Sequence, residues 1–118
     1  MITREEILAH VKQTYHVTAD YPWSTSPTHA VLRHEANKKW FALIMEVPKC
    51  KLGLDGDALV DIIDLKCNPL LIGALRAEPG VFPAYHMNKE HWITIRLDSP
   101  FLRDTLYQLI DESYHLTM

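Results

Sequence analysis

The sequence has few of the residues that disulfide-stabilised or membrane-spanning proteins require. Its 118 residues include two cysteines, Cys50 and Cys67, and four glycines. Two cysteines without a CxxC pair exclude a disulfide-rich miniprotein and favour free thiols in a reducing compartment. No apolar run approaches the roughly 20 residues of a membrane-spanning helix, and the N-terminus lacks the apolar core of a signal peptide. We therefore expect a cytoplasmic protein with no membrane segment.

The chain also lacks an excess of basic charge. Twelve Lys and Arg face fifteen Asp and Glu, which gives a formal net charge of -3. Proteins that bind nucleic acids mainly through phosphates usually carry a basic excess, so this balance argues against a strong general affinity for DNA. Residues 28–97 hold nine basic and eight acidic residues, whereas residues 98–118 hold one basic and four acidic residues. The acidic charge is thus concentrated at the C-terminal end.

Motifs of common enzymes are missing as well. The sequence contains no GxSxG, HExxH, GxGxxG or phosphate-cradling glycine loop. Asp61 and Asp64 lie in a predicted strand at a spacing that turns them to opposite faces, which makes them a poor acid–base pair. Ser113 has no acid–base partner close in sequence, so a nucleophilic role has no support. We expect no enzyme, no catalytic residue and no cofactor.

What is present indicates one globular domain over residues 1–118. Hydrophobic residues make up 47% and charged residues 23%, the mixture of an ordinary soluble fold. Apolar residues recur at helical spacing in some segments and alternate in others, and Asn-Pro or Ser-Pro pairs are typical helix starts. The predicted elements are a helix over 4–15, strands over 31–35, 40–47 and 59–66, a helix from Asn68-Pro69 to Pro79-Gly80, strands over 81–87 and 91–97, and a helix after Ser99-Pro100.

This order, α-β-β-β-α-β-β-α, predicts an α+β two-layer sandwich. Adjacent strands with short turns pair antiparallel, and the helices must cover one face of the sheet. The alternation does not reveal what covers the second face. Phe41, Leu43, Met45 and Val47 are expected on one face of their strand. The expected buried positions of the helices are Leu70, Leu71, Ala74 and Leu75 in the middle helix and Leu102, Leu106, Leu109, Ile110 and Tyr114 in the last helix.

The densest cluster of chemically versatile side chains is Tyr-His-Met-Asn-Lys-Glu-His-Trp at residues 85–92. If residues 87–90 form a hairpin turn, His86 and His91 lie opposite each other. Two imidazoles at that spacing suit a metal ion, with Cys67 or Asp64 as a third ligand.

Two other interpretations of this cluster stay open. As the tip of a hairpin, Asn88 and Lys89 would lie on a nucleic-acid backbone, with Lys49 and Lys51 of the other long loop as a second contact. As a purely structural turn, Asn88 would adopt a left-handed conformation and His86 would bond a neighbouring backbone group.

A separate aromatic residue, Trp23, follows Pro22 in the irregular stretch 16–27. Aromatic side chains more often complete a core than bind a ligand, so we expect Trp23 to close one end of the core. Stacking of a ligand on its ring is the alternative.

The segment DIIDLKCNPLLIGALRAEPGVFPAYHMNKEHWITIRLD, residues 61–98, resembles the signature of the MmcQ/YjbR family. The resemblance extends over nearly the whole chain. The matching elements are Leu65-Lys66-Cys67 with Pro69, the pair Gly80 and Pro83, His86-Met87-Asn88-Lys89, His91-Trp92, Pro22-Trp23, Lys39-Trp40-Phe41-Ala42 and Ser113-Tyr114.

The resemblance implies a CyaY-like fold, also described as secretion-chaperone-like, with one five-stranded antiparallel sheet. It further implies a "double wing" DNA-binding motif, and on that basis we predict a small DNA-binding module. Relatives of the frataxin type bind iron on an acidic first helix, but here this helix offers only Glu5 and Glu6. The predicted DNA contacts are Lys66, His86, Asn88, Lys89 and His91, with Lys49 and Lys51 on the outside.

The main alternative is a protein-binding adaptor. Secretion chaperones of the same fold are small, acidic and often dimeric, and the net charge of -3 suits that class better than DNA. A metal-binding protein is the third possibility. The sequence leaves the choice between monomer and dimer open.

Overall fold

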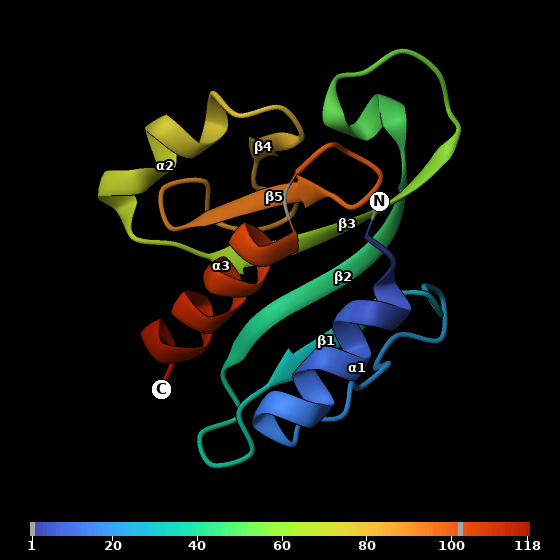
Figure 1. Cartoon of the computed structure of the whole chain (residues 1–118). Coiled ribbons are helices and arrows are strands. Elements are labelled where there is room, and N and C mark those ends of the chain that lie inside the picture. Colours follow the sequence, from blue (N-terminus) through green and yellow to red (C-terminus); the bar gives the residue numbers. More distant parts are fainter. Residues whose placement is uncertain (1, 102) are drawn as a thin grey trace.

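The computed structural model describes residues 2–101 and 103–118 and has the predicted order of elements (Figure 1). Three helices and one five-stranded antiparallel sheet make an α+β fold, as the periodicity predicted. No helix in these described residues is long and apolar enough to cross a membrane. The elements are α1 (Arg4–Tyr15), β1 (Ala30–Arg33), β2 (Trp40–Pro48), the 3-10 helix η1 (Lys49–Leu52), β3 (Leu59–Lys66), α2 (Pro69–Arg76), β4 (Val81–Pro83), β5 (Trp92–Arg96) and α3 (Arg103–Leu116).

The strands are arranged in the order β1-β2-β3-β5-β4, so β3 lies at the centre of the sheet. Ile63 of β3 pairs with Ile44 of β2 on one side and with Ile95 of β5 on the other. Because successive side chains alternate, Ile63 faces one side of the sheet and its neighbours Ile62 and Asp64 face the other. This register sends two different sets of side chains to the two faces.

The first face is covered by helices, and we call it the helix-covered face. In Figure 1, α1 and α3 lie in front of the strands. The buried cluster on this side joins residues of all three helices to strand residues such as Ile44 and Ile63. The Ser113 hydroxyl of α3 donates to the Phe41 carbonyl (2.5 Å) and accepts from the Lys66 N–H (2.9 Å), which fixes α3 to two neighbouring strands. This bond pattern gives Ser113 a structural role.

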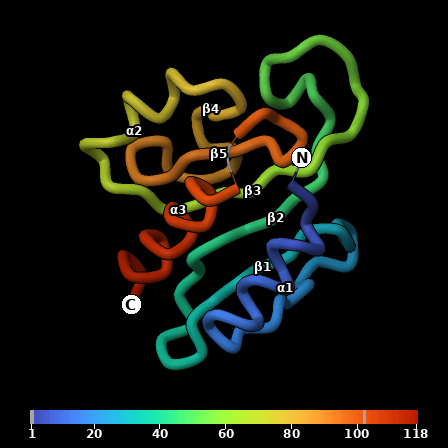
Figure 2. Tube along the Cα trace, in the orientation of Figure 1, coloured from blue at the N-terminus to red at the C-terminus, as the bar shows by residue number. Residues whose placement is uncertain are grey.

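The second face is covered by loops, and we call it the loop-covered face. A separate buried cluster of strand side chains lies here, and Trp40, Leu52 of η1 and Tyr85 pack against it. Figure 2 shows the chain leaving the sheet in a wide excursion between β2 and β3, and it leaves again between β4 and β5. The buried cluster consists of Val31, Leu43, Met45, Val47, Val60 and Ile62.

The prediction that Phe41 shares a face with Leu43 was wrong. Leu32 of β1 pairs with Ala42, but the next residue, Arg33, pairs with Trp40. This irregularity leaves Phe41 as an extra residue in β2 and turns its ring to the helix-covered face. Leu43, Met45 and Val47 keep the predicted alternation and face the loops.

The expected buried face of α2 was wrong for three of its four residues, since only Leu75 packs against the core. Leu70 is 88% exposed, Leu71 and Ala74 are exposed, and Ile72 is the buried residue of this helix. The helix is short and apolar around much of its circumference, so spacing alone could not select its inner side. Its start was predicted correctly, because the Asn68 carboxamide accepts a bond from the Leu70 N–H.

Two element boundaries differ from the prediction. Strand pairing between β4 and β5 ends at Pro83 and Ile93, so residues 84–91 form a long connection instead of a tight hairpin turn. Helix α3 begins at Arg103 and not directly after Ser99. The Ser99 hydroxyl donates to the Arg96 carbonyl. Leu106, Leu109 and Ile110 are buried as expected, whereas Leu102 lies outside the described residues.

Candidate nucleic-acid interface

The connection between β4 and β5, residues 84–91, carries most of the predicted contact residues, and we call it the wing. His86 has a left-handed backbone with φ of 64°, a conformation that was predicted for Asn88. The Asn88 side chain instead accepts from the Glu90 N–H at 2.7 Å, and its carbonyl accepts from the Trp92 N–H at 3.0 Å. Asn88 therefore shapes the turn with its own polar groups.

The predicted placement of His86 opposite His91 was wrong, because the strand register ends before either residue. His86 lines a hollow together with His29 and Trp23. His91 is exposed at the end of the wing, just before β5, and its backbone carbonyl accepts from the Cys67 N–H.

The wing and the other long loop meet in a second hollow of about 200 Å³, which we call the lysine groove. Lys51 of η1 and Lys89 of the wing both line it, together with Tyr85. Both lysines are exposed. Two of the predicted contacts, distant in sequence, are thus brought to one place.

The remaining predicted lysines lie apart from this groove. Lys66 is at the end of β3, opposite Trp92, and by alternation it lies on the loop-covered face. The backbone N–H of Lys49 donates to the Ala58 carbonyl, and the side-chain charge of Lys49 acts on Asp98. The hydrogen bond from Arg96, aided by the charges of Arg96 and Lys49, lowers the pKa of Asp98.

The proposed metal ligands do not converge. Cys67 is buried in the core of the helix-covered face, whereas His86 lines a hollow on the loop-covered face. Burial, and then the charge of Glu112, raise the pKa of the Cys67 thiol to about 11, so it stays protonated at neutral pH. Within residues 2–101 and 103–118, no group of three His, Cys, Asp or Glu side chains is placed to hold a metal ion.

On the other side of the wing lies a hollow of about 330 Å³ that we call the aromatic pocket. The Trp23 and Trp40 rings meet edge to face, with centroids 5.7 Å apart and planes at 79°. Trp23 is 36% exposed, so it borders a hollow and does not close the core as predicted. The lining consists of Trp23, Thr25, Ser26, His29, Trp40, Leu43, Met45, His86 and Met87.

Sequence reasoning missed this pocket, although a signal was present. Its lining includes Trp23, Trp40 and His86-Met87, which belong to three separate segments that carry the family resemblance. One imidazole in the pocket is held neutral: burial, and then the charges of His86 and Arg4, lower the pKa of His29. At neutral pH the pocket therefore offers aromatic surfaces and the uncharged imidazole of His29.

Beneath the wing, the loop-covered face holds a fully buried carboxyl group, Asp64. The Thr94 hydroxyl donates to Asp64 Oδ1 and accepts from the Tyr85 N–H at 2.8 Å, which links the wing to the centre of the sheet. Asp64 Oδ2 has no hydrogen-bond partner among the described groups. Burial raises the pKa of Asp64 to about 7, and the Thr94 bond and the charge of Lys89 limit this rise.

The neighbouring acid in β3, Asp61, behaves differently. Its carboxylate accepts from Arg4 of α1 at 2.8 Å. The two carboxyls of β3 thus have separate partners, Arg4 for Asp61 and Thr94 for Asp64.

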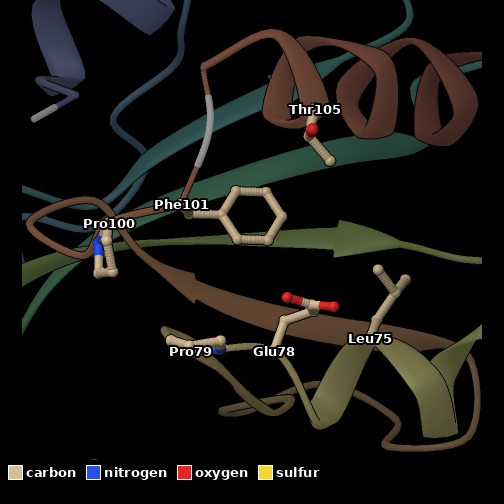
Figure 3. Close-up of a pocket in the computed structure, with 6 residues that line it drawn as sticks. All are labelled: Leu75, Glu78, Pro79, Pro100, Phe101 and Thr105. Atoms are coloured by element: carbon tan, nitrogen blue, oxygen red, sulfur yellow. The ribbon is translucent and has the colours of Figure 1, made fainter.

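A further hollow of about 500 Å³ lies between the end of α2 and the start of α3 (Figure 3). The Phe101 ring and the Glu78 carboxylate point into it, and Leu75 borders it from α2. None of the predicted contact residues is among its described lining residues, and none of those residues is basic. It therefore offers nothing that suits a phosphate.

Comparison with known proteins gives one family match and relatives that match part or nearly all of the chain. The YjbR family model matches residues 12–116. The uncharacterized protein YyaQ of Bacillus subtilis (strain 168) is 50% identical over 117 residues, which cover 99% of each chain. The uncharacterized protein YjbR of Escherichia coli (strain K12) is 40% identical over 53 residues, which cover 44% of this chain and 45% of that protein.

Solved structures agree with the fold. A crystal structure of a Pseudomonas syringae protein is 45% identical, covers 99% of this chain and 100% of its own, and superposes with a TM-score of 0.97. A Deinococcus radiodurans protein with 23% identity covers 98% of this chain and 78% of its own, with a TM-score of 0.73, and so shares the fold. By its family match and its full-length relative, the chain belongs to the YjbR family.

Proposed function

We propose that this YjbR-family protein binds DNA on its loop-covered face, with phosphates at the lysine groove. The observation that carries the proposal is the convergence of Lys51 and Lys89, which come from two different loops, on one hollow. Two exposed lysines that line one groove suit successive phosphates of a nucleic-acid backbone. The exposed thiol of Cys50 on η1 fits action in the reducing cytoplasm.

The aromatic pocket also supports the proposal that DNA binds on the loop-covered face. It lies beside the lysine groove, and residues of the wing line both: Tyr85 and Lys89 border the groove, while His86 borders the pocket. Basic grooves next to aromatic platforms are typical of proteins that bind single-stranded nucleic acids.

The net charge of -3 predicts modest affinity. Asp55 and Asp57 lie in the same loop as Lys51, so the attraction for phosphates is local to the groove. Two or three phosphate contacts predict that log K falls against log salt concentration with a slope of roughly -1.4 to -2 on single strands.

Fluorescence anisotropy of labelled single-stranded and duplex DNA, titrated with protein at low and moderate salt, tests this proposal. We expect salt-dependent binding that weakens about tenfold or more when Lys51 and Lys89 are both replaced by Ala. Lys12→Ala is the matched control, because Lys12 is an exposed lysine of α1 on the opposite side of the sheet. Absence of binding at low salt, or an equal loss in the Lys12 variant, would refute the proposal.

A second candidate function, protein binding, is favoured by the exposed leucines of α2. Leu70 is 88% exposed and Leu71 is 44% exposed, on a helix that buries little of its apolar surface. Exposed apolar surface of this kind suits a protein partner. Replacement of both leucines by Ser should abolish pull-down of such a partner and leave DNA binding unchanged, whereas retention of the partner would exclude α2 as its site.

A further inference from the structure

We infer that the aromatic pocket holds one unstacked base of a single DNA strand whose backbone lies along the lysine groove. This inference rests on the proposed function, and it adds a requirement for a base, where the groove alone requires only phosphates.

The geometry of the indoles favours a flat ligand. Trp23 and Trp40 meet at 79°, so they form a corner in which one ring stacks on a planar group and the other contacts its edge. Leu43 and Met45 are buried strand residues that supply the apolar floor. The volume of about 330 Å³ falls within the usual range for small-molecule pockets, roughly 300–1,000 Å³.

The polar groups of the pocket favour an uncharged heterocycle. Thr25 and Ser26 supply hydroxyls, and His29 and His86 supply imidazole nitrogens that donate or accept hydrogen bonds. A phosphate is disfavoured by the apolar floor, since burial of an unpaired charge is costly. A nucleobase combines the required flat ring with neutral polar edges.

His86 joins the pocket to the groove. It holds a left-handed φ of 64°, which is unusual for a residue with a side chain and is often found at functional sites. Its ring lies 4.0 Å from that of Tyr85, which borders the lysine groove. Tyr85 and His86, which are adjacent in the wing, thus line different hollows. A DNA strand that crosses the wing would place its phosphates at Lys51 and Lys89 and one base at Trp23.

This arrangement predicts a preference for single strands over duplex DNA. A base in a duplex must first leave its stack and its partner, which carries an energetic cost. An unpaired strand offers its bases without that cost.

The test compares an oligothymidylate with a strand of equal length in which every site is abasic. Wild-type protein should bind the oligothymidylate about tenfold tighter, because stacking of one base on an aromatic side chain contributes in this range. Trp23→Ala should remove this difference, and Trp23→Phe should keep most of it. Both variants should bind the abasic strand like wild type, which shows that they are folded and that the lysine groove is intact.

Two results distinguish failure of this inference from failure of the proposed function. Equal affinity of wild-type protein for both strands would overturn the base pocket and leave the lysine groove standing. Absence of binding to either strand at low salt would overturn the proposed function. In that case thymidine alone is titrated into the protein while tryptophan fluorescence is recorded, which tests whether the pocket binds a base. Quenching that Trp23→Ala abolishes supports the base pocket, and no quenching overturns it.

Discussion

The two faces of the sheet use the same strands and differ in what covers them. On the helix-covered face, apolar side chains of three helices and of the strands form one buried cluster, and Ser113 satisfies the backbone groups that it meets. On the loop-covered face, the wing borders two hollows, is linked through Thr94 to the buried carboxyl of Asp64, and contains His86, whose backbone is left-handed.

The difference separates a face that stabilises the fold from the face on which we propose that DNA binds. The helix-covered face holds its elements in place by extensive burial, which is the main source of folding stability. The loop-covered face carries features that are unfavourable for stability, namely a carboxyl oxygen with no partner among the described groups and an incompletely filled apolar surface. Features of this kind are expected at binding sites, which agrees with the proposal that DNA binds on this face. Substitutions on the two faces should therefore have different consequences.

The largest expected effect is on the helix-covered face. Ile110→Ala removes a fully buried side chain of α3, and we expect it to lower the free energy of unfolding by about 2–5 kcal/mol. Leu70→Ala, a similar truncation at an exposed position of α2, should change it by less than about 0.5 kcal/mol. Urea denaturation measures both. Comparable losses would contradict the assignment of this face as the stabilising one.

A somewhat smaller effect concerns the buried carboxyl of the loop-covered face. Because the pKa of Asp64 is about 7 in the folded protein and 3.8 ordinarily, its ionised form is disfavoured by folding. With respect to this group the protein is most stable at a pH below the ordinary pKa, and it loses that stability as the pH rises through the folded-state pKa. An asparagine side chain cannot ionise, so Asp64→Asn removes this loss.

Urea denaturation at a series of pH values checks the prediction. The stability of Asp64→Asn relative to wild type should increase by roughly 2–4 kcal/mol between about pH 4 and about pH 8. A relative stability that does not vary with pH would show that Asp64 ionises normally in the folded protein. Comparison with wild type removes the contribution of the other titrating groups.

A smaller effect than at Ile110 or Asp64 is expected at the aromatic pocket. Trp23 is partly exposed and contacts Trp40 and His29 edge to face. Trp23→Ala should lower the free energy of unfolding by roughly 1 kcal/mol, the range of one aromatic pair. A thermal melt monitored by circular dichroism measures this change. A loss as large as that of Ile110→Ala would make Trp23 a core residue, as its sequence first suggested.

The same division explains how much the sequence could predict. Periodicity located the helices and most strands, because burial against the sheet imposes regular spacing. It failed at Phe41, because an irregular pairing with β1 turned this side chain to the other face of the sheet. It also failed at Leu70, because α2 is apolar around much of its circumference and its spacing did not determine the buried side. Local composition does not encode either feature.

The candidate site was predictable only in part. Lys51 and Lys89 were identified individually, but their meeting in one groove depends on the paths of two loops. The aromatic pocket arises from three distant segments, so no local pattern could indicate that Trp23, Trp40 and His86 converge. Their common membership in the family-like motifs was the one signal available.

The central claim is that the loop-covered face is the binding surface, and NMR titration tests it most directly. Single-stranded DNA would be added to isotope-labelled protein, and the shifted amide and indole signals would be assigned. We predict that the changes concentrate at Trp23, Trp40, Lys51 and residues 85–89, with few on α1 and α3. Changes concentrated on α1 and α3, or a spectrum that does not change at low salt, would contradict this account.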